Sequence, residues 1–356
     1  MREPMDSPFF SQRQAAGFAL VLLFFLALPL ILAKSGALSR RDVYETVPVK
    51  WGSFPYIHQQ IFEKTSDIDL LFLGTSLLWE AIDTPHVQQE MTKRLGREAN
   101  VISLGTNWRC EELNYTLLRD ILERRKVRMV VLSMPIFRQK DELPHVQSYR
   151  WLLYGKDEAS LQGLPARNRL TSYAGNVLGA PRHLLSLVRP DHADSAPYEL
   201  TLGSRQVQRG IGNSPFTRWT PEPPAIPVRD MIYSEQTRGN FHFTGQALNP
   251  FQMHFLKLTF ELLRRHGVKT VLLNIPVWTD RQSPQVIERM PWTGLFGENI
   301  TLIGIPPATL FRGMNPDEVD RLFYNDYDWP NHHFNQNGNE FFTRVIAPAL
   351  VEAVSR

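Results

Sequence analysis

Short apolar runs alternate along this chain with segments of helical periodicity, and this alternation limits the fold more than any other feature. Buried strands are predicted at residues 69–74, 100–105, 127–133, 268–275 and 298–305. Helices are predicted between and after them at residues 85–95, 111–125, 250–266 and 336–354. Strands joined by helical crossovers pair in parallel, with helices on both faces of the sheet. We therefore expect an α/β protein, a three-layer αβα sandwich with a mainly parallel five-stranded sheet.

The alternation stops between about residues 135 and 248, where Pro, Gly, Arg and aromatic residues dominate. A structureless loop of this length is uncommon in a compact domain. We therefore predict an irregular inserted lid or subdomain within a domain that spans residues 67–356. Residues 35–66 are of mixed polarity and are predicted to be a linker.

An uncharged apolar stretch from Ala15 to Ala33 is long enough to cross a membrane as a helix. The alternative is the apolar region of a cleaved signal peptide, with Ser35 and Ala37 at the cleavage site. An uncleaved anchor is preferred, because the stretch is longer than most signal-peptide cores and Lys34 precedes the proposed cut. Residues 1–34 then form a cytoplasmic tail and transmembrane anchor, and the large domain is extracytoplasmic.

Charge and cysteine content exclude several classes of function. The net charge is only +3 and no long run of Lys or Arg occurs, so the electrostatic pattern of a nucleic-acid-binding protein is missing. Cys110 is the single cysteine, and no Cys/His cluster has the spacing of a structural zinc site. We expect neither a metal nor a cofactor.

Polar residues that directly follow the first two predicted strands are candidates for chemistry, because open parallel sheets hold their sites at the carboxyl ends of the strands. Gly74-Thr75-Ser76 places a hydroxyl on a sharp strand-to-helix turn, where it can act as a nucleophile. Gly105-Thr106-Asn107 places an amide after the next strand, where it can donate to a developing negative charge. Taken singly, Ser76 is as well explained as a helix N-cap, and the second motif as a turn.

A third polar segment precedes the last helix, at residues 324–338, and it contains both carboxylates and histidines. A catalytic histidine needs a carboxylate that fixes its tautomer, and this segment supplies both groups. Its histidines are His332 and His333, and its carboxylates are Asp326 and Asp328. The alternative interpretation is a solvated polar loop.

In these three segments the chain resembles the SGNH (GDSL-like) hydrolases and acyltransferases. Gly74-Thr75-Ser76 resembles the Gly-Asp-Ser of their first block, Gly105 resembles their second-block glycine, and His333-Phe334-Asn335-Gln336-Asn337-Gly338 resembles the end of their last block. The resemblance covers about residues 67–134 and 249–354. It implies a flavodoxin-like SGNH fold, Ser76 as nucleophile and His333 as base. It also implies that the backbone N–H groups of Ser76 and Gly105 line the oxyanion hole.

The chain departs from this family at two positions. Ser133 follows the third strand, where the family has an asparagine, so Asn107 is expected to complete the oxyanion hole. Pro330 stands three residues before His333, where the family has its aspartate. The carboxylate is therefore assigned to Asp328, with Asp326 as the alternative, and His332 is the alternative base.

Threonine in the first block, the single anchor and the His-Phe-Asn ending resemble the membrane-attached branch of the family. That branch includes the D-alanine transfer protein of teichoic acid modification and the alginate O-acetylation proteins. The resemblance implies serine-dependent transfer of an acyl group from a donor onto or off a cell-surface or secreted polysaccharide, beside a membrane-bound O-acyltransferase. The alternatives are a secreted carbohydrate or lipid esterase and a catalytically weak polysaccharide-binding partner of such an enzyme.

Overall fold

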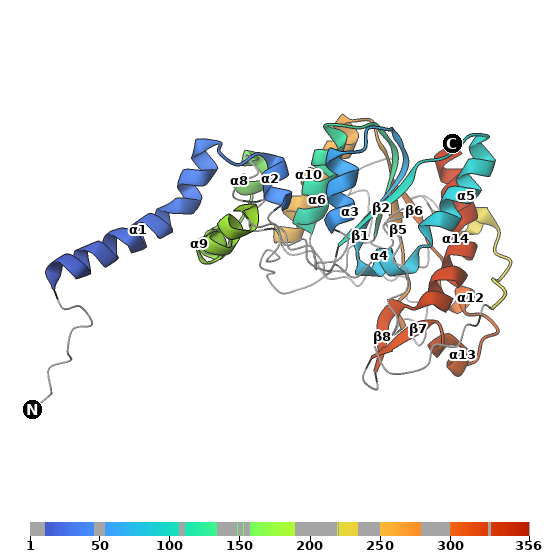
Figure 1. Ribbon diagram of the computed structural model, residues 1–356. Coiled ribbons are helices and arrows are strands. Elements are labelled where there is room, and N and C mark those ends of the chain that lie inside the picture. The colour runs from blue at the N-terminus through green and yellow to red at the C-terminus, as the bar shows by residue number, and fades with distance from the viewer. Residues whose placement is uncertain are drawn as a thin grey trace, which may run out of the picture. The chain divides into compact units, whose positions relative to one another are not determined.

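The chain divides into two compact units. The N-terminal unit comprises Met1–Pro48 and Leu143–Asp191, and the sheet unit comprises Val49–Glu142 and His192–Arg356. The structure is a computed structural model (Figure 1), and it describes residues 11–45, 54–106, 111–133, 148, 152, 157–188, 219, 221–233, 250–278, 300–326 and 329–355.

A six-stranded sheet with the order β2-β1-β3-β5-β6-β4 forms the centre of the sheet unit. Its strands are β1 (Ile68–Thr75), β2 (Val101–Thr106), β3 (Val127–Ser133), β4 (Ile232–Tyr233), β5 (Lys269–Leu273) and β6 (Thr301–Ile303). All neighbours pair in parallel except β4, which is antiparallel to β6. The predicted five-stranded parallel sheet is confirmed. Without β4, the strands follow the doubly wound order 2-1-3-4-5, in which ligands bind where the order reverses, between β1 and β3.

Helices surround this sheet. They are α3 (Phe54–Phe62), α4 (Ser76–Ala81), α5 (Thr84–Leu95), α6 (Glu111–Leu122), α10 (Pro250–Arg265), α12 (Pro307–Leu310), α13 (Pro316–Asp320) and α14 (Gln336–Ser355). The four longest, α5, α6, α10 and α14, lie where the sequence predicts. Side chains of α5 and α14 share one buried core with alternate strand residues such as Leu70, Phe72 and Val131. Helix α6 contacts β1 and packs against α3 and α10.

Several elements of the sheet unit differ from the sequence prediction. Helix α3 lies in the segment predicted to be a linker, and α12 and α13 lie where no helix is predicted. The polar segment before α14 is not a loop: β7 (Phe323–Asp326) and β8 (Trp329–Phe334) form an antiparallel hairpin. Its stability comes from aromatic packing, since the Phe334 ring stacks on Phe323 at 4.6 Å and on Phe342 at 5.4 Å between centroids. The edge strand β4, preceded by a short 3₁₀ helix η1 (Val228–Asp230), comes from the segment predicted as an irregular insertion.

A charged pair fixes the start of β1, at the end of the strand remote from Ser76. Arg97 donates to both carboxylate oxygens of Asp69, at 2.9 and 2.5 Å, and the backbone N–H of Asn100 donates to the same carboxylate at 2.9 Å. Burial raises the pKa of Asp69, but the hydrogen bonds and the positive charge of Arg97 outweigh burial, so its pKa lies below its usual value. The pair joins the chain that enters β2 to the first residues of β1.

The N-terminal unit is helical in the residues that the structure describes. It contains α1 (Gln12–Ser35), α2 (Arg40–Glu45), α8 (Glu158–Gln162) and α9 (Ala166–Val188). Within the described part of the chain, α1 is the one helix that is long and apolar enough to cross a membrane. It contains the predicted stretch from Ala15 to Ala33, and it packs against α9.

Candidate active site

The turn between β1 and α4 presents Ser76 without any intervening loop. β1 ends at Thr75 and α4 begins at Ser76. The Thr75 hydroxyl accepts the N–H of Leu77 at 3.3 Å, so Thr75 is the N-cap of this helix. The capping role that offered an alternative explanation for Ser76 is thus filled by its neighbour, and the half-buried Ser76 hydroxyl is available for another partner.

Gly74 and Gly105 allow α4 to lie close to the carboxyl ends of the strands. The two glycines are opposite each other in the pairing of β1 with β2. A Cβ on Gly74 would come within 2.9 Å of the Leu78 Cδ2, and one on Gly105 within 2.5 Å of the Trp79 Cβ, and both side chains belong to α4. Neither position has room for a side chain, so both glycines set the place of α4 and of the serine at its start.

The partner of Ser76 is His333, which lies on β8 directly before the buried Phe334. The Ser76 Oγ and the His333 Nε2 are 2.8 Å apart, within hydrogen-bond distance, although 257 positions separate the two residues in the chain. The structure therefore brings together the residues that the sequence analysis assigned as nucleophile and base.

Asn335 holds the end of the hairpin in place beside His333. Its side-chain amide donates to the carbonyl oxygens of Arg321 and Phe323, both at 2.9 Å, and its side-chain oxygen accepts the N–H of Gly338 at 3.2 Å. The last bond is an N-cap of α14. A Cβ on Gly338 would collide with the Leu322 carbonyl oxygen, so a glycine is required where the helix passes the hairpin.

Helix α14 also binds the far end of α4. Asn339 donates to the carbonyl of Glu80 at 2.8 Å, and the Thr343 hydroxyl donates to the carbonyl of Ala81 at 3.3 Å. These carbonyls belong to the last turn of α4, where no intrahelical donor remains. The helix that follows His333 is thus bonded to the last turn of the helix that starts at Ser76.

Four of the predicted residues are not placed in this geometry. Asn107 and Asp328 lie outside the described residues, as do the side chains of Asp326 and His332. The backbone of Asp326 pairs with that of Trp329, which lies on β8 four residues before His333. The orienting carboxylate and the amide of the oxyanion hole therefore stay predictions.

Three residues that position the pair are not predicted from the sequence. Thr75 gives no distinct signal as a cap, because Ser76 carries the same hydroxyl chemistry one position later. Asn339 and Thr343 lie one helical turn apart on α14, where local sequence carries no sign that their acceptors are about 260 residues away.

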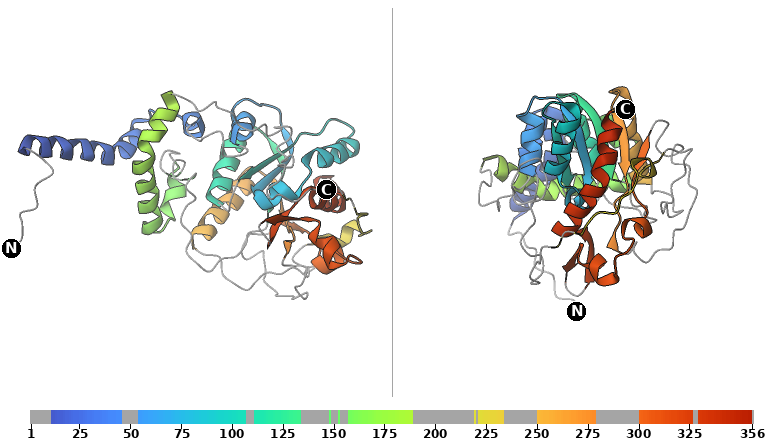
Figure 2. Two further views of the ribbon diagram at one scale, coloured as in Figure 1. Left: turned by 60° about the horizontal axis from the view of Figure 1, so that its bottom comes forward. Right: turned by 90° about the vertical axis from the view of Figure 1, so that its right-hand side faces the viewer.

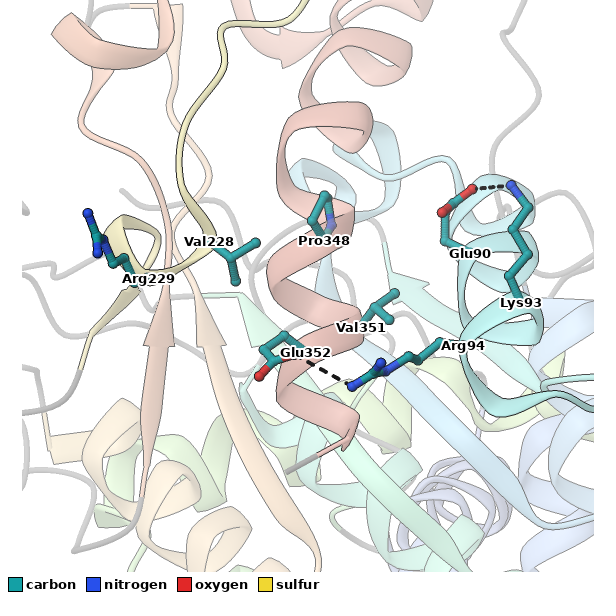
Figure 3. Close-up of a pocket in the computed structure, with 8 residues that line it drawn as sticks. All are labelled: Glu90, Lys93, Arg94, Val228, Arg229, Pro348, Val351 and Glu352. Carbon is teal, nitrogen blue, oxygen red and sulfur yellow. Dashed lines mark hydrogen bonds and ion pairs between the residues drawn. The ribbon is translucent and has the colours of Figure 1, made fainter.

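A pocket of about 540 Å³ in the sheet unit lies apart from this pair. Its lining residues are Glu90, Lys93, Arg94, Val228, Arg229, Pro348, Val351 and Glu352, from α5, η1 and the second half of α14 (Figure 3). Thr343 is five residues before the first α14 residue of the pocket, and the lining does not include Ser76 or His333. Its charges are largely paired with each other, as in the ion pair of Lys93 with Glu90 at 2.6 Å.

Within the described parts of the chain, no three His, Cys, Asp or Glu side chains gather in a group that could hold a metal ion. The chemistry that the described site offers is that of a serine hydroxyl with an imidazole in contact. Comparison with known proteins adds no relative: no protein-family model matches the chain, and no curated protein sequence matches it.

Proposed function

We propose that this protein is a serine-dependent acyl-transfer enzyme with an SGNH-type fold. The observation that carries the proposal is the contact of Ser76 Oγ with His333 Nε2 at 2.8 Å. This contact lies at the carboxyl end of β1, beside the point between β1 and β3 where the strand order reverses. Figure 1 draws α3, α6 and α10 on one side of the strands and α5 and α14 on the other, which supports the three-layer αβα arrangement.

In the proposed reaction, Ser76 attacks the carbonyl carbon of an ester while His333 Nε2 removes the hydroxyl proton. The tetrahedral intermediate collapses, the leaving alkoxide takes the proton from the imidazolium, and an acyl-serine remains. A second hydroxyl group then gives its proton to His333 and attacks the acyl-serine, which restores the Ser76 hydroxyl and releases the new ester or acid. Each half-reaction needs only the imidazole as proton carrier.

The remaining parts of the catalytic machinery are assigned from the resemblance. The Ser76 N–H heads the first turn of α4, where the helix supplies no acceptor, and it is proposed as one donor to the oxyanion. Gly105 N–H and Asn107 are proposed as the others. Asp328 is proposed as the carboxylate that orients His333.

The substrate is proposed to be a polysaccharide outside the cytoplasm, with a membrane-bound O-acyltransferase as partner in acyl supply. The supporting observation is α1, whose length and apolar composition suit a membrane anchor. Anchoring would keep the serine near the membrane surface at which such polymers are made. Reporter fusions after Arg356 test the orientation, and a cytoplasmic signal would remove the polysaccharide from the proposal.

Hydrolysis of a chromogenic acetyl ester by the full-length protein in detergent tests the chemistry. Ser76→Ala and His333→Ala should each lower the rate by about 10⁴-fold or more, because each removes one half of the reacting pair. Ser66→Ala is the matched control, since it removes an exposed hydroxyl that precedes β1, at the end of the strand remote from the pair. Full activity in Ser76→Ala would overturn the proposal.

A further inference from the structure

In helix α9 of the N-terminal unit, one apolar stripe is exposed and one polar stripe is buried, which is the reverse of the usual arrangement. Residues spaced four apart along one stripe are exposed and apolar: Ala166, Leu170, Ala174 and Leu178. Residues spaced four apart along another stripe are buried and polar: Asn168, Ser172 and Asn176. The two leucines are 68% and 84% exposed, whereas Asn176 is fully buried.

This arrangement is unfavourable in water. Each leucine left exposed forgoes about 1.5–3 kcal/mol of hydrophobic stabilisation, and a buried amide must find all its hydrogen bonds inside the protein. A surface helix in water normally turns its apolar stripe inward. In a lipid environment the preference is inverted, since polar groups must be satisfied within the protein and apolar side chains can face the acyl chains.

The contact of α9 with α1 locates the reversed helix at membrane depth. The Tyr173 hydroxyl of α9 donates to the carbonyl of Leu26 in α1, and the buried residues of α1, Leu28 and Pro29, lie in the same half of that helix. Leu26 precedes Ala33 by seven residues, which is about 10 Å along a helix. If Ala15 to Ala33 spans a hydrocarbon core of about 30 Å, Tyr173 reaches well inside its boundary.

The direction of α9 fits a helix that lies along the membrane plane. Figure 2 (left) shows α9 crossing the C-terminal part of α1 at a steep angle. A helix that crosses a membrane-spanning segment in this way runs along the bilayer surface rather than through it. Arg167 and Arg169, in the first turn of α9, are exposed and can extend toward lipid headgroups.

We propose that α9 is an interfacial membrane helix that embeds its Leu170 and Leu178 stripe among the acyl chains beside α1. It lies in the leaflet that contains the C-terminal half of α1. The inference rests on the proposed anchoring by α1 and adds a second membrane contact from a segment more than 100 residues further along the chain. The enzymatic part of the proposed function does not enter it.

Depth-dependent quenching in liposomes tests the inference. Single cysteines are introduced by Leu170→Cys and Leu178→Cys in the full chain carrying Cys110→Ser, and each is labelled with an environment-sensitive fluorophore. Both leucines are exposed, so the changes leave internal packing intact. We expect blue-shifted emission and strong quenching by phospholipids that carry a nitroxide on the acyl chain.

Two further labels separate failure of the inference from failure of the anchor. Leu20→Cys reports on α1, where Leu20 is 69% exposed, and Glu123→Cys reports on an exposed residue of the sheet unit that should stay in water. Quenching at position 20 with water-exposed labels at 170 and 178 would overturn the inference and leave the anchor standing. Water-exposed labels at all four positions would overturn both. Labels at 170 and 178 that are shielded from water but not quenched by lipid would replace the bilayer with a protein partner, and so would also overturn the inference.

Discussion

Replacing Asn335 by alanine tests whether this side chain, rather than the histidine alone, sets the geometry of the pair. The side chain donates twice, to the carbonyls of Arg321 and Phe323, and caps α14 through Gly338 N–H. Loss of an N-cap costs about 1 kcal/mol, and each further hydrogen bond about 1 kcal/mol. Asn335→Ala should therefore lower the free energy of unfolding by about 3 kcal/mol.

The effect on turnover should exceed the effect on stability. His333 is two residues before Asn335, and a displacement of its ring by about 1 Å is enough to cost about 10²-fold in rate. Turnover of a chromogenic ester is measured at a temperature at which the variant is fully folded, and urea unfolding followed by circular dichroism gives the stability.

Asn315→Ala is the matched control, because Asn315 caps α13 through Glu318 N–H at 3.0 Å in a capping box. It should cost about 1 kcal/mol of stability and leave turnover unchanged. If Asn335→Ala matched Asn315→Ala in both stability and turnover, Asn335 would not position His333.

Three other substitutions probe the packing, the electrostatics and the unplaced carboxylate. Gly105→Ala should lower the free energy of unfolding by about 1–3 kcal/mol and reduce turnover, because its Cβ would press on Trp79 and displace α4. Urea unfolding and the ester assay measure the two effects, and a variant with unchanged stability and turnover would contradict the prediction. Asp69→Asn should cost about 1.5–3 kcal/mol near neutral pH by removing the charged partner of Arg97. Because the pKa of Asp69 is lowered by folding, its stabilisation is present above the unfolded pKa of about 4 and is lost as the pH falls through the folded pKa. The difference between wild type and Asp69→Asn should thus shrink as the pH falls below about 4, and a pH-independent difference would argue against the ion pair. Asp328→Asn should lower the ester turnover by about 10²- to 10⁴-fold, less than loss of the nucleophile does, and full activity would remove Asp328 from the site.

The sequence predicted the sheet because its strands carry their own signal. Val127–Ser133 is rich in apolar residues, with four in succession from Met129 to Leu132, and the structure contains β3 at these positions. The hairpin β7–β8 carries no such signal: its strands contain Asp, Asn, His and Pro, and it is held by the stacking of Phe323 and Phe334. The two-residue strand β4 is too short for any pattern and depends on the edge of β6.

The candidate site was accessible from sequence only in part. Ser76 and His333 could be identified because each follows or precedes a predicted element at the edge where parallel sheets hold their ligands. The contacts that place them were not accessible, since Asn339 and Thr343 bind carbonyls of a helix at the other end of the domain sequence. The reversed polarity of α9 likewise appears only when the exposure of its residues is known.

The central claim is that His333 activates Ser76, and covalent labelling of the serine tests it most directly. A fluorophosphonate reacts with a serine hydroxyl whose proton is removed by a neighbouring base. The full-length protein is treated with the reagent, and mass spectrometry of its peptides gives the labelled residue and the rate of labelling. We predict that Ser76 is labelled in the wild type and at least about 10²-fold more slowly in His333→Ala. Labelling of Ser76 at the same rate in both proteins, or of a different residue in the wild type, would contradict the account.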